Sequence, residues 1–300
     1  MIAHRFAIIA LLAVFPALQA RADEPAAIKL TLRTLRPAED KKDTYVPVTK
    51  AESWNPKQSA IIVCDMWDLH HCLNAVRRLE EMAPRMNQVL EKARSQGILI
   101  IHAPSSCMDA YKEYPGRKLA QNAPKAANLP KDIGVWCHKI PNEEKGKYPI
   151  DQSDGGEDDD PKEHAEWRAK LTKLGRNPGA PWKKQYDGLK IYDQDAISDS
   201  GVEIWNLLEQ RGISNVIVLG VHTNMCVLGR PFGLRQLAKN GKNVVLMRDM
   251  TDTMYNPARA PYVPHFRGTE LIIEHIEKFV CPTITSDQVI GGETFRFKGM

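Results

Sequence analysis

A cysteine follows an apolar segment of the chain at a point where a strand should end and a helix should begin. Residues 216–219 are apolar and mostly β-branched, which is typical of a strand covered on both faces. Gly220 ends this segment, and Thr223 and Asn224 are common first residues of helices. The spacing predicts that Cys226 lies near a helix N-terminus, where the helix dipole can lower the pKa of a thiol. A buried structural cysteine would fit the same local pattern.

Three other polar residues stand at or near the ends of apolar segments in the same way: Asp65, His102 and Asp249. Helical apolar spacing occupies residues 77–95, 202–210 and 268–279, between or after these segments. Buried strands that alternate with helices predict an α/β three-layer sandwich, with a mainly parallel central sheet and helices on both faces. Because sites in such sheets form at the carboxyl ends of the strands, we expect a catalytic cleft at this edge.

The composition is that of a globular protein with a sizeable core. The chain has 300 residues, of which 43% are hydrophobic and 26% charged, and its formal net charge is +4. That charge is too small to indicate a nucleic-acid partner, and no basic stripe with interleaved aromatic residues occurs. We therefore expect a small-molecule substrate and no nucleic acid, with a homo-oligomer left open.

The first 22 residues are predicted to be a secretory signal peptide. Arg5 supplies a basic start, residues 6–18 are largely apolar, and Ala20 and Ala22 offer small residues for cleavage. An uncleaved anchor is the alternative, but the apolar segment is short for a membrane span. We expect an exported protein, periplasmic or secreted, with no membrane attachment after cleavage.

Two segments lack the strand and helix patterns of the rest. Residues 23–55 are mixed polar and contain proline, which predicts a tail or packing arm. Within the main domain, residues 56–300, an insertion spans about 104–187. Its Trp136, His138, Trp167 and Trp182 would either cover a pocket or, as we favour, give the insertion its own small core. The acidic residues 151–160 lack EF-hand spacing and are predicted to form a solvated loop.

The six cysteines are dispersed and show no zinc-ribbon spacing. Cys64 lies inside an apolar strand pattern and is expected to be a buried thiol. Export permits disulfides among the cysteines other than Cys64 and Cys226, and the sequence leaves the pairing open. Those possible partners are Cys72, Cys107, Cys137 and Cys281.

Three segments together resemble the isochorismatase-like cysteine hydrolases, the superfamily that includes nicotinamidases. They are AIIVCDMWD around Asp65, GVHTNMCV around Cys226 and VVLMRDMTD around Asp249. The resemblance covers roughly residues 58–105 and 187–280. It implies an isochorismatase-like hydrolase domain over residues 56–300 and leaves the insertion unexplained.

The resemblance implies an Asp, Lys and Cys catalytic set. Asp65 matches the general base that takes the proton from Cys226, whose thiolate attacks an amide carbonyl to form a thioester that water hydrolyses. It also implies a cis peptide between Val221 and His222. The backbone N–H groups of His222 and Cys226 would then bind the oxyanion.

The position of the lysine is less well defined by the motif. Within LKIYDQDAISDSG, Lys190 is the best match, and Lys184 is the alternative. A cation beside Asp65 and Cys226 would stabilise both anions.

Nicotinamidases bind a metal through an Asp-x-His element, which the corresponding HAPSSCMD lacks. Asp68, His70 and His102 could instead form a carboxylate–imidazole site for zinc or iron. Hydrogen-bonded histidines without a metal are the alternative.

These observations favour a hydrolase of a small amide or related C–N bond. The alternatives are a catalytically silent small-molecule-binding protein with the same fold, or an isochorismatase-type hydrolase without thioester chemistry. A thiol redox protein lacks support because no Cys-x-x-Cys motif occurs. The silent protein would be favoured if neither Lys190 nor Lys184 lay near Asp65 and Cys226.

Overall fold

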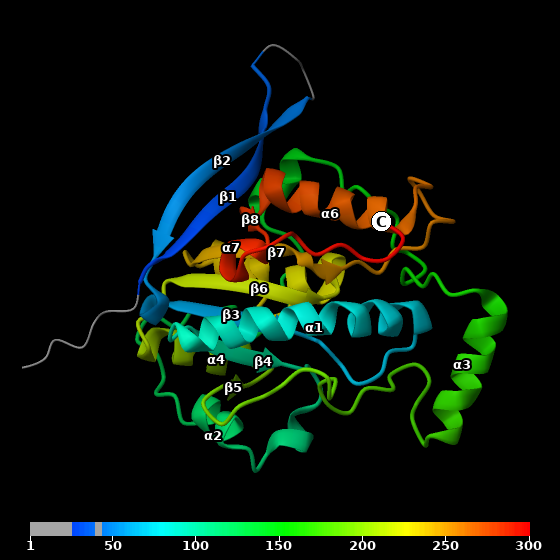
Figure 1. Ribbon diagram of the computed structural model, residues 1–300, viewed down its shortest axis with the longest axis horizontal. Helices are drawn as coiled ribbons and strands as arrows, with labels where there is room; N and C mark the ends of the chain where they lie inside the picture. The colour runs from blue at the N-terminus through cyan, green and yellow to red at the C-terminus, as the bar shows by residue number, and fades with distance from the viewer. Residues whose placement is uncertain (1–25, 40–43) are drawn as a thin grey trace, which may run out of the picture.

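The central feature of the computed structural model is a sheet with the strand order β2-β1-β8-β7-β6-β3-β4-β5 (Figure 1). The structure describes residues 26–39 and 44–300, so the predicted signal peptide lies outside the described residues. The strands are β1 (Ile28–Pro37), β2 (Tyr45–Trp54), β3 (Ser59–Cys64), β4 (Leu99–Ala103), β5 (Ala196–Ile197), β6 (Asn215–Val221), β7 (Asn243–Asp252) and β8 (Thr283–Ile284).

Strands β3 to β8 are parallel to one another, and only β1 and β2 run antiparallel to their neighbours. All six residues of β3 are buried, as expected for a central parallel strand that is covered on both faces. The helices are α1 (Leu73–Ser95), α2 (Pro115–Gln121), α3 (Pro161–Lys173), α4 (Gly201–Gln210), α5 (Leu234–Lys239), α6 (His265–Phe279) and α7 (Asp287–Ile290).

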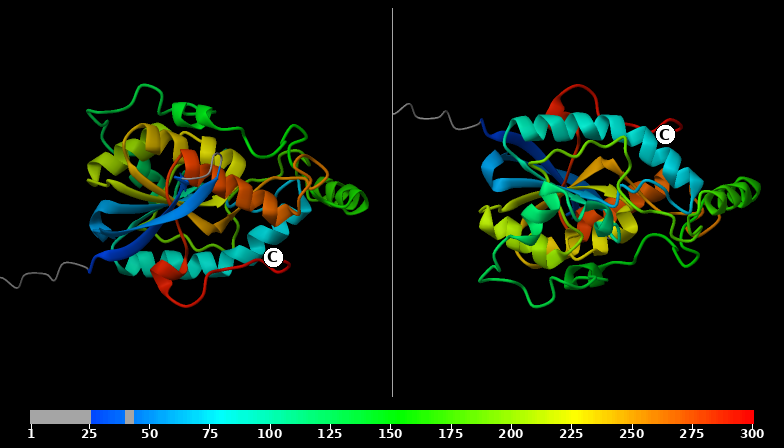
Figure 2. Two further views of the ribbon diagram at one scale, coloured as in Figure 1. Left: turned by 90° about the horizontal axis from the view of Figure 1, so that it is seen from above. Right: turned by 90° about the horizontal axis from the view of Figure 1, so that it is seen from below.

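Helices cover both faces of the sheet (Figure 2), and a hydrophobic core lies between the sheet and the helices on each face. Helix α1 packs Met82 and Met86 against the face that carries Ile61 of β3. Helices α4, α5 and α6 pack against the other face, which carries Ile62 and Val218. The predicted three-layer α/β sandwich is therefore confirmed.

The segment predicted as a tail or packing arm is a β-hairpin that joins the edge of the sheet (Figure 1). In β1, Ile28, Leu30 and Leu32 are buried and alternate with exposed residues. This alternation extends over one strand only. On its other side β1 pairs with β8, which lies about 250 residues away in the sequence, with Arg33 opposite Thr283. Most of the pairing of β1 is local, with β2, but β2 is almost entirely exposed, so the hairpin carries a strand-like apolar pattern on β1 alone.

The insertion packs onto the sheet domain, so the expectation that its tryptophans form a separate small core is wrong. Trp167 and Leu171 of α3 pack against Val76 of α1. Trp182 stacks on Trp67, just beyond β3, with ring centroids 4.5 Å apart. The insertion thereby reaches the carboxyl edge of the parallel strands.

All six cysteines are buried free thiols. None of the disulfides that the sequence left open is present. Among residues 26–39 and 44–300, no helix is both long enough and apolar enough to cross a membrane.

Candidate active site

The structure brings Asp65 and Cys226 together at the carboxyl edge of the sheet. Strands β3 and β6 are parallel neighbours, with Cys64 opposite Gly220, so the residues that follow them share one edge. Asp65 is fully buried and adopts a φ of 46°, in the left-handed region. Cys226 is 7% exposed, and its thiol lies close enough to the Asp65 carboxylate for each group to shift the pKa of the other.

The Asp65 carboxylate is held by two further donors. The backbone N–H of Ser105 donates to Oδ1 at 2.8 Å, and Nε of Arg230 donates to Oδ2 at 3.0 Å. Burial raises the pKa of the Asp65 carboxyl, while the Arg230 guanidinium and these hydrogen bonds oppose that rise. The carboxylate is therefore fixed in position and more basic than an exposed aspartate.

Arg230 is the functional residue that the sequence reasoning missed. It lies four residues after Cys226, one helical turn along the chain, so that both side chains reach the same face. Its guanidinium also lies 5.3 Å from the ring centroid of Trp136, which is supplied by the insertion. The sequence offered one signal for this role, namely a charged residue four positions after the predicted nucleophile.

The structure places neither candidate lysine beside Asp65. Nζ of Lys184 pairs with Asp187 at 2.7 Å on the surface. Lys190 lies against α1, where its N–H bonds to Asn87 and its carbonyl accepts from Arg94. The assignment of Lys190 or Lys184 as the catalytic cation is thus contradicted, and Arg230 occupies that place.

The Cys226 thiol is not a preformed thiolate. Burial raises its pKa well above the ordinary value, and the adjacent Asp65 carboxylate raises it further, although Arg230 opposes them. The expected lowering by a helix dipole is therefore wrong, because loss of hydration and a neighbouring anion outweigh it. The resting site holds a protonated thiol against a carboxylate that can accept its proton.

A backbone donor is available beside Cys226. The Val221–His222 peptide is cis, and in the part of the chain that the structure describes the His222 N–H donates to no acceptor. Cys226 belongs to a π-helix, Thr223–Val227. The first residue of this helix is anchored to β7, because the hydroxyl oxygens of Thr223 and Thr251 share a hydrogen bond of 2.7 Å. Burial lowers the pKa of the His222 ring to about 3, so this imidazole stays neutral.

A cluster of aromatic rings lies next to this site in the chain, beginning two residues after Asp65 and reaching His222. Trp67 follows Asp65 by two residues, and its ring stacks on Trp182 and on His70, with centroids 4.5 and 6.1 Å away. The His70 ring lies 4.8 Å from that of His222. These rings give the reacting groups an apolar, poorly hydrated environment, in which electrostatic interactions are stronger than in water.

The three predicted metal ligands do not fit a metal site. Both ring nitrogens of the buried His102 are already bonded, to Gln185 at 2.9 Å and to Asp195 at 3.2 Å. Within the described residues, Asp68, His70 and His102 do not form a group whose ligand atoms lie within 4.8 Å of one another. Their present partners are Arg176 for Asp68 and the Cys72 N–H for His70.

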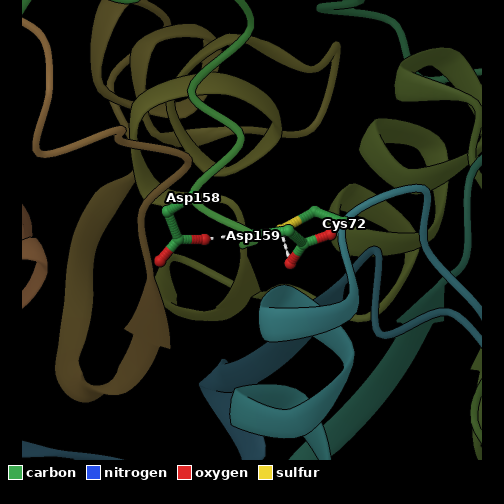
Figure 3. A group of neighbouring side chains, drawn as sticks. All are labelled: Cys72, Asp158 and Asp159. Atoms are coloured by element: carbon green, nitrogen blue, oxygen red, sulfur yellow. Dashed lines mark hydrogen bonds between the residues drawn. The ribbon is translucent and has the colours of Figure 1, made fainter. Parts of the chain in front are cut away.

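The acidic segment of the insertion is exposed over residues 152–155, as expected for a solvated loop, whereas the side chains of Asp158 and Asp159 pack against the start of α1. The Cys72 thiol donates to Asp158 and Asp159, with sulfur–oxygen distances of 3.4 and 3.3 Å (Figure 3). Asp159 also accepts from the N–H groups of Leu73 and Asn74 at the start of α1. Two groups here have mutually close ligand atoms, namely Cys72, Asp158 and Asp159, and Glu157, Asp159 and His164. Because Asp159 caps α1, we assign both groups a structural role.

Asp249, the fourth strand-end residue, also lies outside the site. Its carboxylate accepts from the N–H and hydroxyl of Ser286 and from the N–H of Phe295. Of the four residues expected at the cleft, the structure therefore joins only Asp65 and Cys226.

Comparisons with known proteins give similarity at the level of structure. No protein-family model and no curated protein matches the sequence. The fold is similar to a cysteine hydrolase from Pseudomonas syringae pv. phaseolicola 1448A, at 16% identity and a TM-score of 0.46, covering 79% of this chain and 92% of that chain. It is also similar to an isochorismatase from Pseudomonas putida KT2440, at 13% identity and a TM-score of 0.43, covering 77% and 89%. An isochorismatase family protein from Burkholderia thailandensis gives 13% identity and a TM-score of 0.42, covering 79% and 97%.

Proposed function

We propose that this protein is a cysteine hydrolase that cleaves a small amide or a related C–N bond through a thioester on Cys226. The observation that carries the proposal is the contact between the Cys226 thiol, the buried Asp65 carboxylate and the Arg230 guanidinium. A nucleophile, a base and an orienting cation are the parts that acyl transfer by a cysteine requires.

In the first half of this reaction, Asp65 takes the proton of the Cys226 thiol as sulfur attacks the carbonyl carbon. The His222 N–H, which has no other acceptor in the described chain, donates to the oxygen on which negative charge develops. Asp65 then returns the proton to the nitrogen, the C–N bond breaks, and the amine or ammonia leaves a thioester behind.

In the second half, water attacks the thioester carbonyl while Asp65 accepts one of its protons. The C–S bond breaks, sulfur recovers the proton, and a carboxylic acid is released. Arg230 holds the Asp65 carboxylate in place and favours the anionic forms of both groups. Because its guanidinium stays protonated, Arg230 orients and stabilises charge and does not exchange protons.

The experiment that tests this proposal is a screen of small primary amides for ammonia release, with mass spectrometry of the protein for an acyl adduct. Cys226→Ser replaces the thiol by a near-isosteric hydroxyl of far higher pKa, so turnover should fall by several orders of magnitude while the fold is retained. Ordinary turnover by Cys226→Ser would contradict the thioester route.

Cys64→Ser is the matched control, because Cys64 is a buried thiol that precedes Asp65 and lies in β3. A hydroxyl without a partner in that core should cost about 1–3 kcal/mol of unfolding free energy and leave the chemistry intact. A loss of turnover equal to that of Cys226→Ser would remove the distinction between the two thiols.

A second candidate, a silent small-molecule-binding protein, is favoured by the absence of both predicted lysines from the site. It predicts ligand binding without ammonia release and without an adduct on Cys226. The same screen separates the two functions.

A further inference from the structure

A cavity outside the candidate active site is lined by the β1–β2 hairpin, helix α6 and the C-terminal segment. Figure 1 shows the course of these three elements. The cavity has a volume of about 860 Å³, within the range of small-molecule sites. We call it the hairpin cavity. Neither Asp65 nor Cys226 lines it, so an inference about it does not rest on the proposed hydrolase function.

The hairpin cavity is lined by a guanidinium, that of Arg248, whose hydrogen-bonding capacity is largely unused among the described residues. Arg248 of β7 has no ion pair among the described residues, and its one side-chain hydrogen bond goes from Nη1 to Thr283 Oγ1 at 3.1 Å. A guanidinium has five N–H donors, so most of those of Arg248 remain available. Arg33 of β1 also lines the cavity, and the repulsion between these two cations adds to burial in lowering the pKa of Arg248.

The acidic side chains that line the hairpin cavity are already committed to other partners. Oε1 of Glu277 accepts from Nε of Arg33 at 2.8 Å and from the Thr283 hydroxyl. Arg267 bonds to the other two lining glutamates, Glu270 and Glu274, at 2.9 and 2.8 Å. Asp249 accepts from Ser286 and Phe295. Glu277 and Asp249 favour the charged form of Arg248 from nearby, but neither accepts a hydrogen bond from its guanidinium, whose free N–H groups remain available to a ligand.

Two buried polar atoms in the same wall also lack partners. Thr269 is 6% exposed and Glu277 is 4% exposed, yet Oγ1 of Thr269 and Oε2 of Glu277 make no hydrogen bond in the described chain. A buried polar atom without a partner costs free energy, so a ligand or water is expected to complete its bonding. The Thr269 hydroxyl can donate to a ligand carboxylate, whereas Oε2 of Glu277 only accepts and requires a donor such as water. This is an observation independent of the charge of Arg248.

The rest of the wall is aromatic. Phe266 of α6 stacks on Phe297 with ring centroids 5.2 Å apart, and Phe295 meets Phe297 edge-on at 5.0 Å. All three line the cavity. An anion that is small and fully hydrated, such as inorganic phosphate, would gain nothing from such a wall, whereas a planar apolar body would.

We propose that the hairpin cavity binds a small carboxylate with a planar apolar body, its carboxylate on the Arg248 guanidinium and its body against Phe266, Phe295 and Phe297. A guanidinium and a carboxylate match in geometry and form paired charge-assisted hydrogen bonds. The binding requires no chemistry at Cys226.

Isothermal titration of the purified chain with benzoate tests this assignment. We expect one benzoate per chain, with binding at least about tenfold weaker for benzamide and for inorganic phosphate. Failure of benzoate to bind, or equal binding of benzamide or phosphate, would overturn the proposal.

Three variants locate the site. Arg248→Gln should weaken benzoate binding at least about tenfold, and Arg248→Lys, which keeps the charge without the planar fork, should weaken it less. Two controls, Arg211→Gln and Cys226→Ser, should leave benzoate binding unchanged. Arg211 is an exposed arginine that follows α4. If Arg248→Gln proves unfolded by its melting curve, Arg248→Lys carries the test. Unchanged binding in the folded Arg248 variants, or loss of binding in Cys226→Ser, would place the benzoate elsewhere and refute the assignment.

Discussion

The arrangement of three side chains decides what chemistry this protein can do. Asp65 is completely buried, which would make its charge costly, and Arg230 compensates at 3.0 Å. Cys226 lies between these opposite charges, so its proton has an acceptor and its sulfur has a nearby cation. This arrangement suits the proposed reaction, in which the thiol gives up its proton as it attacks, because a permanently ionised thiolate would need a lowered pKa.

At the residue scale, Arg230→Gln should move the acidic limb of the pH profile of kcat/KM to higher pH. Without the guanidinium, the pKa of Asp65 rises further, so the base is protonated over more of the acidic range, and turnover at neutral pH should fall by about 10²-fold. The measurement is a pH–rate profile on an amide found by the screen. Arg230→Lys keeps the charge and should shift the limb less.

The effect of Arg230 on the site can also be tested without a substrate. Arg230 also opposes the rise in the pKa of Cys226, so alkylation of Cys226 by iodoacetamide at a fixed pH should be slower in Arg230→Gln than in the parent. Identical alkylation rates and identical pH profiles in the two proteins would show that Arg230 does not act on this pair.

At the scale of elements, a buried network ties the insertion to the sheet and its helices. His265 of α6 bonds through Nε2 to Asp252 of β7 at 2.9 Å, and its Nδ1 lies 3.1 Å from Asp158 of the insertion. Arg78 of α1 pairs with both aspartates, at 2.7 Å to Asp252 and 2.8 Å to Asp158. Four segments that are distant in the sequence thus share one set of charges.

This network should make stability depend on pH on the alkaline side. The two aspartates raise the pKa of His265 from 6.5 to about 9, against the effect of burial, so the protonated ring stabilises the fold fully below pH 6.5. As pH rises from 6.5 through 9, up to about 3 kcal/mol should be lost. Urea unfolding at a series of pH values measures this, and His265→Gln should flatten the curve in that window.

His138→Gln is the control for that experiment, because His138 is an exposed histidine of the insertion. It should leave the pH dependence unchanged. An identical alkaline loss of stability in the parent and in His265→Gln would exclude His265 as its source.

The β1–β2 hairpin gives a second prediction at this scale. Leu30 of β1 is 2% exposed and packs into the core that α1 covers, whereas Val48 of β2 is 44% exposed. Leu30→Ala should lower the free energy of unfolding by about 2–4 kcal/mol, and Val48→Ala should change it by less than about 0.5 kcal/mol. Chemical denaturation of both variants measures the difference. Equal small effects would mean that β1 is not part of the core.

At the scale of the whole molecule, we propose that the chain is exported and that its mature form lacks the signal peptide. Cleavage after Ala20 or Ala22 should leave Arg21 or Asp23 as the first residue. Cell fractionation followed by intact-mass measurement tests this. An N-terminal Met1 on protein recovered from the cytosol would contradict it.

The insertion acts on the whole molecule by reaching the site from outside the sheet. Trp136 lies over Arg230, and Trp182 stacks on Trp67, two residues after Asp65. In the proposed reaction these rings would limit the access of water to the reacting groups.

The sequence by itself determined the layers of the fold and the place of the nucleophile and base. Apolar segments such as residues 216–219 fix buried strands, and parallel pairing of β3 with β6 brings the residues that follow them to one edge. Those patterns are local, so they can be recognised without knowing the rest of the structure. The alternation of Ile28, Leu30 and Leu32 was also present in the sequence, but it is too short to identify a strand without its partners β2 and β8.

Only the tertiary structure decided which cation serves the site and how the thiol is ionised. Arg230 rather than Lys184 or Lys190 lies beside Asp65, because the fold brings only its side chain within reach of that carboxylate. The sequence around each of these residues does not show how far it lies from Asp65 in space. The pKa of Cys226 depends on burial by segments from the whole chain, and burial reversed the direction expected from the helix terminus. Solvation and long-range packing are properties of the assembled fold, because each sums contributions from residues that are far apart along the chain.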